Sequence, residues 1–223
     1  MKRRFNNVAK PGVAKDAREF LALAACGSHA LIEASLANHG LAMLEVRDEK
    51  GRTPLIRAAE TGHSGAIHLL VKKGADINAK DGDGNTALMA AALKGFKGVA
   101  EKLLDLGAEV NLWNFQGQTA LLLAATHRNN NDGKHPMSHR KKDTVRLLLD
   151  RNARIDVADN KGNTPAAWAQ RYGYRDVAAM ITAEEERRRQ LSASDIAVFT
   201  DGLPETITFN SLRLKRPDGK SYG

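Results

Sequence analysis

The sequence predicts an all-α solenoid, a row of about five helix-turn-helix units with hairpin-like fingers between them. Two internal motifs recur in register along the chain, which is the usual sign of a repeat architecture. The composition agrees, because 42% of the residues are apolar but only 5% are aromatic. Alanine, leucine and glycine therefore carry the apolar content, which suits short, closely packed helices better than a β-sandwich.

The first motif is centred on a threonine. It reads GRTPLIRAAETGH from position 51, GNTALMAAALKGF from 84, GQTALLLAATHRN from 117 and GNTPAAWAQRYGY from 162. The threonines are 33, 33 and 45 residues apart, so removing an insertion of 12 residues from the third of these units restores the period of 33. A second motif, which reads LLVKKGADINAKD in the first unit, follows each of the first three copies.

Each unit has a simple physical logic. The threonine can cap the first helix, a proline such as Pro54 suits its first turn, and paired alanines let the helix pack closely. The second helix ends before a residue suited to the left-handed backbone conformation, Gly74 in the first unit and Asn152 in the third. We expect helices near 55–61, 65–73, 88–94, 98–106, 121–128 and 143–151. The expected core contains Leu55, Ala58, Ala59, Leu69, Leu70, Leu88, Leu103, Leu104, Leu121, Leu147 and Leu148.

The two motifs together resemble the ankyrin repeat family, whose pattern is x-G-x-T-P-L-x-x-A-A-x-x-G-H…L-L-x-x-G-A-D-x-N-A. The match is nearly complete in residues 48–80, good in 81–113 and interrupted by the insertion in 114–158. Upstream, 15–47 resembles an N-terminal capping unit, and downstream, 159–191 resembles a degenerate C-terminal one. The resemblance implies an ankyrin-repeat solenoid that binds other macromolecules through a surface.

The capping unit at the C-terminal end departs from the pattern. Trp168 and Gln170 stand where small residues are usual, and Glu185 stands where glycine is usual. The repeat pattern stops near residue 191. The chain is therefore divided into a basic N-terminal arm at 1–14, the repeat domain at 15–191 and a C-terminal tail at 192–223.

A second departure recurs along the chain. The histidine usual after the T-P-L triplet is replaced by Ile56, Met89, Leu122 and Ala167. The hydrogen bonds that the resemblance would imply for this histidine are therefore absent, and we expect apolar packing between neighbouring units in their place.

The net charge and the cysteine content indicate which partners and which compartment suit the protein. The formal net charge is +8, which attracts nucleic acid, anionic lipid or acidic protein without distinguishing them. The single cysteine, Cys26, fits a reducing compartment. A lipoprotein signal would need an apolar stretch before Cys26, but Asp16, Arg18 and Glu19 interrupt that stretch. No apolar run of about 18 residues occurs, so no membrane span is expected. We expect a cytoplasmic protein.

Catalytic and metal-binding motifs are incomplete in this sequence. The segment DGDGNT begins like a calcium loop, but Thr86 stands at the glycine position and Ala92 at that of the bidentate glutamate. His127, His135 and His139 lie in the insertion without a cysteine. Neither a phosphate loop nor a nucleophile elbow is found. We therefore expect no enzyme activity, no cofactor and no bound metal.

The resemblance places the binding surface on the concave face, made of the finger tips and the first helices. Trp113 and Phe115 lie on the central finger, and large aromatic residues are the usual anchors at the centre of an interface. The alternative is that one ring folds onto the neighbouring finger or the insertion. The full set of candidate binding residues is Trp113, Phe115, Gln116, Gln118, Arg47, Lys50, Arg52, Lys80, Asp83, Asn85, Lys94, His127 and Tyr172.

Two segments lie outside the regular pattern. Asparagines, an Asp-Gly pair and Pro136 predict that the inserted segment 127–143 is not helical, and either a second contact site or a loose loop fits it. In the tail, the alternating segment 206–214 is a weak candidate strand. The tail can pack on the last unit, add a strand to a partner or remain free.

The function expected from the sequence is stoichiometric, non-catalytic binding of a partner protein by a monomeric ankyrin-repeat protein. The alternatives are an immunity protein or inhibitor that masks a toxin or hydrolase, and a secreted effector that binds host proteins. Nucleic acid is not expected as the partner, because the basic residues are distributed among acidic ones and the sequence has no stacking platform of several aromatics.

Overall fold

The computed structural model describes residues 11–126 and 137–200, with side chains placed at 15–126 and 141–190. The chain divides into two compact units, Met1–Thr182 and Ala183–Gly223. This division falls inside the last helix and earlier in the chain than the boundary after residue 191 that the sequence predicts.

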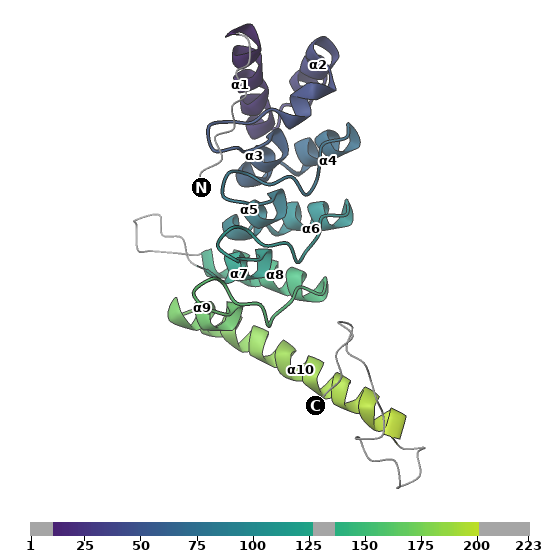
Figure 1. Cartoon of the computed structure of the whole chain (residues 1–223), viewed down its shortest axis with the longest axis vertical. Coiled ribbons are helices and arrows are strands. Elements are labelled where there is room, and N and C mark those ends of the chain that lie inside the picture. Colours follow the sequence, from purple (N-terminus) through teal and green to yellow (C-terminus); the bar gives the residue numbers. More distant parts are fainter. Residues whose placement is uncertain (1–10, 127–136, 201–223) are drawn as a thin grey trace, which may run out of the picture. The chain divides into compact units, whose positions relative to one another are not determined.

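The first unit is a stack of helix pairs, as Figure 1 shows. The first helices of successive pairs pack on one another, and so do the second helices as far as α8. The first helices are α1 (Pro11–Cys26), α3 (Pro54–Thr61), α5 (Ala87–Lys94), α7 (Ala120–Ala125) and α9 (Pro165–Arg171). The second helices are α2 (His29–His39), α4 (Ser64–Lys72), α6 (Lys97–Asp105), α8 (Met137–Asp150) and α10 (Arg175–Thr200), and a 3₁₀ turn, η1 (Leu41–Glu45), follows α2.

The all-α prediction is confirmed. Over residues 11–126 and 137–200, pairing of the β type is limited to one isolated bridge between Trp113 and Thr119. The observed bounds of α3 to α6 lie close to the predicted ones. The helix α1 begins at Pro11, inside the segment that the sequence assigned to the N-terminal arm.

The repeated threonine caps the first helix of each unit, as predicted. In every case its hydroxyl oxygen accepts a hydrogen bond from the backbone N–H three residues later, at 3.3 to 3.4 Å. This bond satisfies one of the N–H groups that have no partner within the helix. The threonines are Thr53, Thr86, Thr119 and Thr164.

We expect the substitution Thr86→Ala to lower the free energy of unfolding by about 1 kcal/mol, because Thr86 is buried and its bond to the N–H of Met89 has no replacement. A thermal melt followed by circular dichroism should show a lower Tm. Thr61→Ala is the control, because the Thr61 hydroxyl is exposed and bonds only to carbonyls of its own helix. Equal losses for the two variants would contradict a capping role for Thr86.

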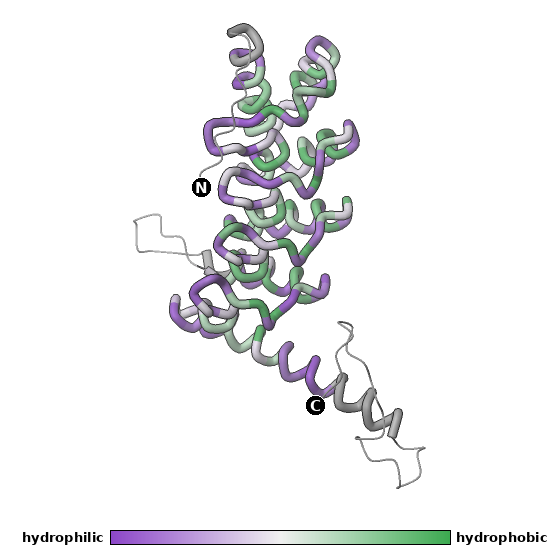
Figure 2. The backbone as a smooth tube through the Cα atoms, in the orientation of Figure 1, coloured by the Kyte–Doolittle hydropathy of each residue, from purple (hydrophilic) through white to green (hydrophobic). Residues whose placement is uncertain are grey.

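The core runs through the stack between the two layers of helices. All the predicted core residues are buried except Leu104. Its side chain packs against the core but is only partly buried, so the prediction of full burial is wrong for this residue. At the positions where histidine is usual, Ile56 and Met89 belong to the continuous apolar core, as predicted, and Leu122 is also buried. Ala167 in the last pair is exposed, contrary to the prediction. Figure 2 shows the hydrophobic colour concentrated in the helices and the fingers largely hydrophilic.

The fingers are hairpin-like turns with a fixed pattern of hydrogen bonds. In the second finger, for example, the N–H of Gly84 donates to the carbonyl of Asp81 at 3.0 Å, and Gly84 adopts a positive φ of 83°. One backbone bond also joins each finger to the next. These bonds run from Gly82 N to Lys50 O at 2.8 Å, from Phe115 N to Asp83 O at 3.0 Å and from Asn160 N to Gln116 O at 3.0 Å.

The inserted segment is partly helical, contrary to the prediction. The helix α8 begins at Met137, whereas the sequence predicts a start near residue 143, so the end of the insertion adds more than one turn to the helix. The cause lies in the residues Met137 to Lys142, which are mostly good helix formers. Asn152, after this helix, has a φ of 59°, so the left-handed conformation predicted there is confirmed.

The helix α10 does not stop where the second helix of a regular repeat would. Glu185 replaces the usual glycine, and the helix continues to Thr200. Within the second unit, Arg187 and Arg188 both donate to Glu184 at 2.7 Å, and Arg189 pairs with Glu185 at 3.0 Å. The hydrogen bond from Arg187 is the main influence that lowers the pKa of Glu184, to about 2. The weak strand predicted at 206–214 lies outside the described residues.

Candidate functional site

A hollow of about 370 Å³ lies between the fingers and the first helices of the second half of the stack. Its position is that of the concave face expected from the repeat pattern. The fingers contribute polar side chains and the helices contribute apolar and aromatic ones. The lining residues are Asp83, Asn85, Asn114, Gln116 and Gln118 from the fingers, and Leu93, Leu123, Thr126, Trp168 and Tyr172 from or just after the helices.

A line of hydrogen-bonded side chains fixes the polar wall of the hollow. Asn85 donates to Asp81 at 3.2 Å, and Asn114 donates through its Nδ2 to Asn85 at 2.8 Å and to Gln118 Oε1 at 3.2 Å. The Asn114 Oδ1 accepts the backbone N–H groups of Gln116 and Gln118 at 3.0 and 2.8 Å. Asn114 is buried, so this network sets the positions of the neighbouring side chains rather than leaving them to solvent.

Two stacked aromatic rings form the other wall. The rings of Trp168 and Tyr172 are 5.1 Å apart between centroids and 7° from parallel. Asp159 accepts a hydrogen bond of 2.8 Å from the Trp168 indole N–H, and the guanidinium of Arg171 lies 5.5 Å from the centroid of a Trp168 ring. Trp168 is thus held from several sides, while Tyr172, 40% exposed, presents its ring to solvent.

The network around Asp159 also affects its charge state. Burial alone would raise the pKa of the Asp159 carboxyl, but the backbone N–H of Asn163 and the indole of Trp168 donate to it. Together these hydrogen bonds outweigh the effect of burial, so the pKa of Asp159 is lowered. The carboxylate that orients Trp168 is therefore ionised at neutral pH.

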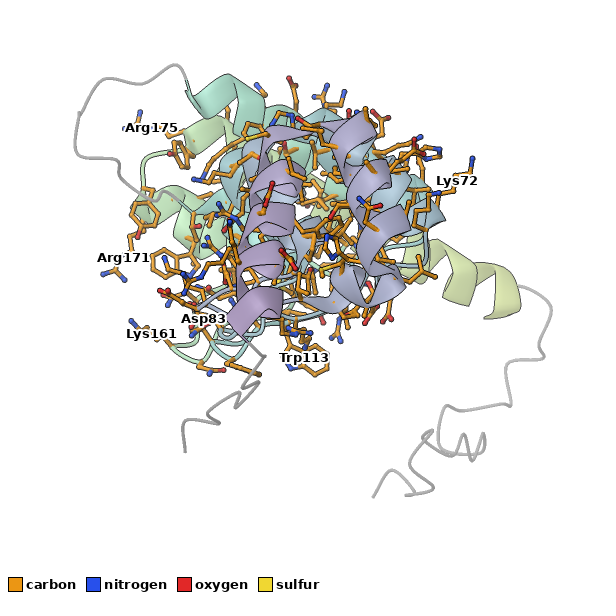
Figure 3. All side chains as sticks on the ribbon, turned by 90° about the horizontal axis from the view of Figure 1, so that it is seen from above. Lys72, Asp83, Trp113, Lys161, Arg171 and Arg175 are labelled. Atoms are coloured by element: carbon orange, nitrogen blue, oxygen red, sulfur yellow. The ribbon has the colours of Figure 1, made fainter. Side chains whose placement is uncertain are left out.

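Trp113 and Phe115 do not line the hollow. They are 60% and 66% exposed, the largest exposures among the large aromatic side chains of the described residues. Figure 3 shows Trp113 at one side of the row of fingers, away from the side on which Asp83, Lys161 and Arg171 lie. A Cβ added at Gly84 would lie 3.0 Å from the ring of Phe115, so this ring rests against the neighbouring finger while most of it stays in water.

A basic edge, which we define as Arg47, Lys80 and Trp113, follows the fingers on the Trp113 side. The guanidinium of Arg47 donates to the carbonyl of Lys80 at 2.6 Å, and the ammonium of Lys80 donates to the carbonyl of Trp113 at 2.8 Å. Each side chain therefore reaches the equivalent position of the next unit, 33 residues away.

Arg52 forms its ion pairs within its own unit. It pairs with Asp48 at 2.7 Å and with Glu60 at 2.8 Å, and it is only partly exposed. Burial alone would lower the pKa of Arg52, but the hydrogen bond with Asp48 raises it, so the guanidinium stays charged. These ion pairs fix the position of the Arg52 side chain at the base of the first full finger.

A buried lysine also lies beside the hollow. Lys141 in α8 is 4% exposed, and its ammonium donates a hydrogen bond to the carbonyl of Thr126, the residue that ends α7. A cation is favoured at the C-terminal end of a helix. Burial nevertheless lowers the pKa of Lys141 to about 8. Because Thr126 lines the hollow, Lys141 fixes one part of its wall.

The structure separates the sequence-predicted residues into groups. Five of them, Asp83, Asn85, Gln116, Gln118 and Tyr172, meet in the hollow. Six others lie along the fingers outside the hollow, namely Arg47, Lys80, Trp113, Phe115, Lys50 and Arg52. Lys94 is exposed at the end of α5. His127 lies outside the described residues.

Sequence reasoning did not select Asn114, Leu123, Thr126 or Trp168, which also line the hollow. Trp168 carried a usable signal, because a large aromatic residue stands there in place of a small one, four residues before Tyr172, which directly follows α9. Asn114 carried less, since an asparagine in a turn usually serves only the local backbone.

The described residues form neither a metal cluster nor a membrane span. Between 15 and 126 and between 141 and 190, no three His, Cys, Asp or Glu side chains are grouped as a metal ion would require. The histidines His127 and His135 of the insertion lie outside the described part of the chain. None of the described helices combines the length and the apolar character of a membrane-spanning segment.

Comparison with known families gives three matches, all to ankyrin repeats. A model of three ankyrin repeat copies matches residues 4–81, a model of many copies matches 70–124, and a model of a single repeat matches 116–160. The matches together run from residue 4 to residue 160. No curated protein sequence matches the chain significantly.

Proposed function

Because the chain belongs to the ankyrin repeat family, we propose that it is a non-catalytic protein that holds a partner protein on the concave face of its stack. Ankyrin repeats generally serve as protein-protein interaction modules, and solenoids offer an extended surface for such contacts. The partner surface in this proposal comprises the hollow together with the exposed rings of Trp113 and Phe115.

The observation that carries the proposal is the hollow itself. It combines a few fixed polar groups with an exposed aromatic ring, which is the usual composition of a recognition site. The exposed rings of Trp113 and Phe115 support it further, because large aromatic residues on a solvated turn bury much apolar area once a partner covers them.

Site-specific photocrosslinking in cells that express the protein tests the proposed surface. A photoreactive amino acid is placed at Gln116 or Tyr172, which line the hollow, and in matched controls at His68 or Glu101, which are exposed on the second helices α4 and α6. We expect one protein adduct from the two hollow positions and none from the two controls. Adducts that form only from His68 or Glu101 would contradict the proposal.

We expect Trp113→Ala and Phe115→Ala each to weaken binding of the crosslinked partner by about 2 kcal/mol or more, because large exposed aromatic residues that a partner covers often dominate the affinity of an interface. Their effect on the free energy of unfolding should stay below about 1 kcal/mol. Titration calorimetry and thermal melts measure the two quantities. Leu31→Ala is the control, because Leu31 is similarly exposed but belongs to α2. Lost stability with unchanged affinity would show that the rings are structural.

A further inference from the structure

We infer that the hollow binds a short, extended and uncharged peptide segment of the partner, and that an apolar side chain of this segment lies on the ring of Tyr172. This inference rests on the proposed function and specifies the part of the partner that enters the hollow.

The size of the hollow selects an extended segment. Its volume of about 370 Å³ is at the small end of the range for ligand sites. An α-helix with its side chains is about 10–12 Å across. A helix or a larger folded element of the partner would therefore rest on the rim of the hollow without filling it. A few residues of extended chain, in contrast, can enter.

The polar wall offers the hydrogen-bonding groups of a peptide. A side-chain carboxamide has one donor and one acceptor group, as a backbone amide does. Asn114 holds the Oε1 of Gln118, which leaves the Nε2 of Gln118 as a donor, and none of the described residues accepts a hydrogen bond from that Nε2. A donor fixed in this way suits a backbone carbonyl of an extended segment.

The charges around the hollow disfavour an acidic segment, and at the aromatic wall they also disfavour a basic one. Asp83 is the only ionisable side chain among the lining residues apart from Tyr172, and it disfavours an acidic ligand. At the aromatic wall, Arg171 already lies near the Trp168 ring, so a second cation there is disfavoured by repulsion. Nucleic acid is disfavoured as well, because the lining offers no lysine or arginine to its phosphates.

The aromatic wall selects an apolar side chain. The ring of Tyr172 is backed by Trp168, which Asp159 holds by its indole N–H. This gives a flat, rigid apolar surface at the edge of the hollow, and Leu123 and Leu93 add apolar lining from neighbouring helices. An aliphatic or proline side chain can cover the Tyr172 ring without needing a charge partner.

Selection from a phage-displayed library of random dodecapeptides tests this inference on the full chain. We expect enriched peptides that share an uncharged stretch with a fixed apolar residue. For fluorescein-labelled copies of them, fluorescence polarisation should show at least tenfold weaker binding to Tyr172→Ala and to Gln118→Glu, and unchanged binding to Tyr172→Phe. Glutamate at 118 keeps the acceptor that Asn114 needs and removes the Nε2 donor. Circular dichroism of each variant confirms that it is folded, and His68→Ala on α4 is the control.

Several results would overturn the inference. These are the absence of enriched peptides, enrichment of acidic or basic peptides only, equal binding by the hollow variants, and binding of a labelled single-stranded oligonucleotide that Tyr172→Ala abolishes. The inference can fail while the proposed function stands, since a folded surface of a partner can still crosslink to Gln116 and Tyr172. Crosslinks from His68 and Glu101 alone would instead remove the proposed function.

Discussion

Leu103→Ala is expected to lower the free energy of unfolding by about 2–5 kcal/mol. Leu103 is 0% exposed and lies in the last turn of α6, where it belongs to the continuous core between the two layers of helices. Truncation removes buried apolar surface and leaves a cavity that packed neighbours can fill only in part. Urea denaturation followed by circular dichroism measures the change.

The adjacent Leu104 provides a matched control for Leu103. It has the same side chain on the same helix but is only partly buried, so Leu104→Ala should cost less than half as much. A loss below about 0.5 kcal/mol for Leu103→Ala, or a larger loss for Leu104→Ala, would show that the helix faces the core with a different side.

The second large effect is a pH dependence of stability caused by Lys141. Its pKa is lowered to about 8 in the folded protein by burial, from an ordinary value of 10.5. Between these pH values the unfolded chain binds more protons than the folded one, so stability rises as the pH increases. From pH 7 to pH 10 we expect the folded state to gain about 2 kcal/mol from this group.

The measurement compares urea unfolding of the wild-type protein and Lys141→Met at pH 7 and pH 10. Methionine removes the titrating group, so the variant should lack the part of the pH response that Lys141 causes. Lys97→Met is the control, because Lys97 is exposed at the start of α6. If the wild-type protein and Lys141→Met respond to pH equally, Lys141 does not carry a buried charge.

The sequence predicts the fold well because its local signals and its long-range period agree. Thr53, Gly74 and Asn152 are each suited to a specific backbone position, and repetition at 33 residues makes the same interfaces recur. The start of α8 is predicted less well. Pro136 favours a non-helical segment in the sequence analysis, although proline is well tolerated at the first helical position.

The candidate site is only partly predictable, for a different reason. The pattern locates the finger tips but not the direction in which each side chain leaves the finger. Trp113 and Gln116 are only three positions apart in the sequence, yet Trp113 lies on the basic edge and Gln116 lines the hollow. The role of Thr126 likewise depends on the contact with Lys141, across an insertion of irregular sequence. Such relations come from packing in three dimensions, which a repeat pattern does not encode.

The backbone bonds between fingers have a mechanical consequence. Because Gly82, Phe115 and Asn160 each bond to the preceding finger, pulling one tip away from the stack strains a bond to its neighbour. A force on one tip is therefore shared along the row, and the fingers resist separate movement because they are joined near their tips. A partner would meet a surface whose spacing is set before contact, and it would spend little free energy on ordering that surface.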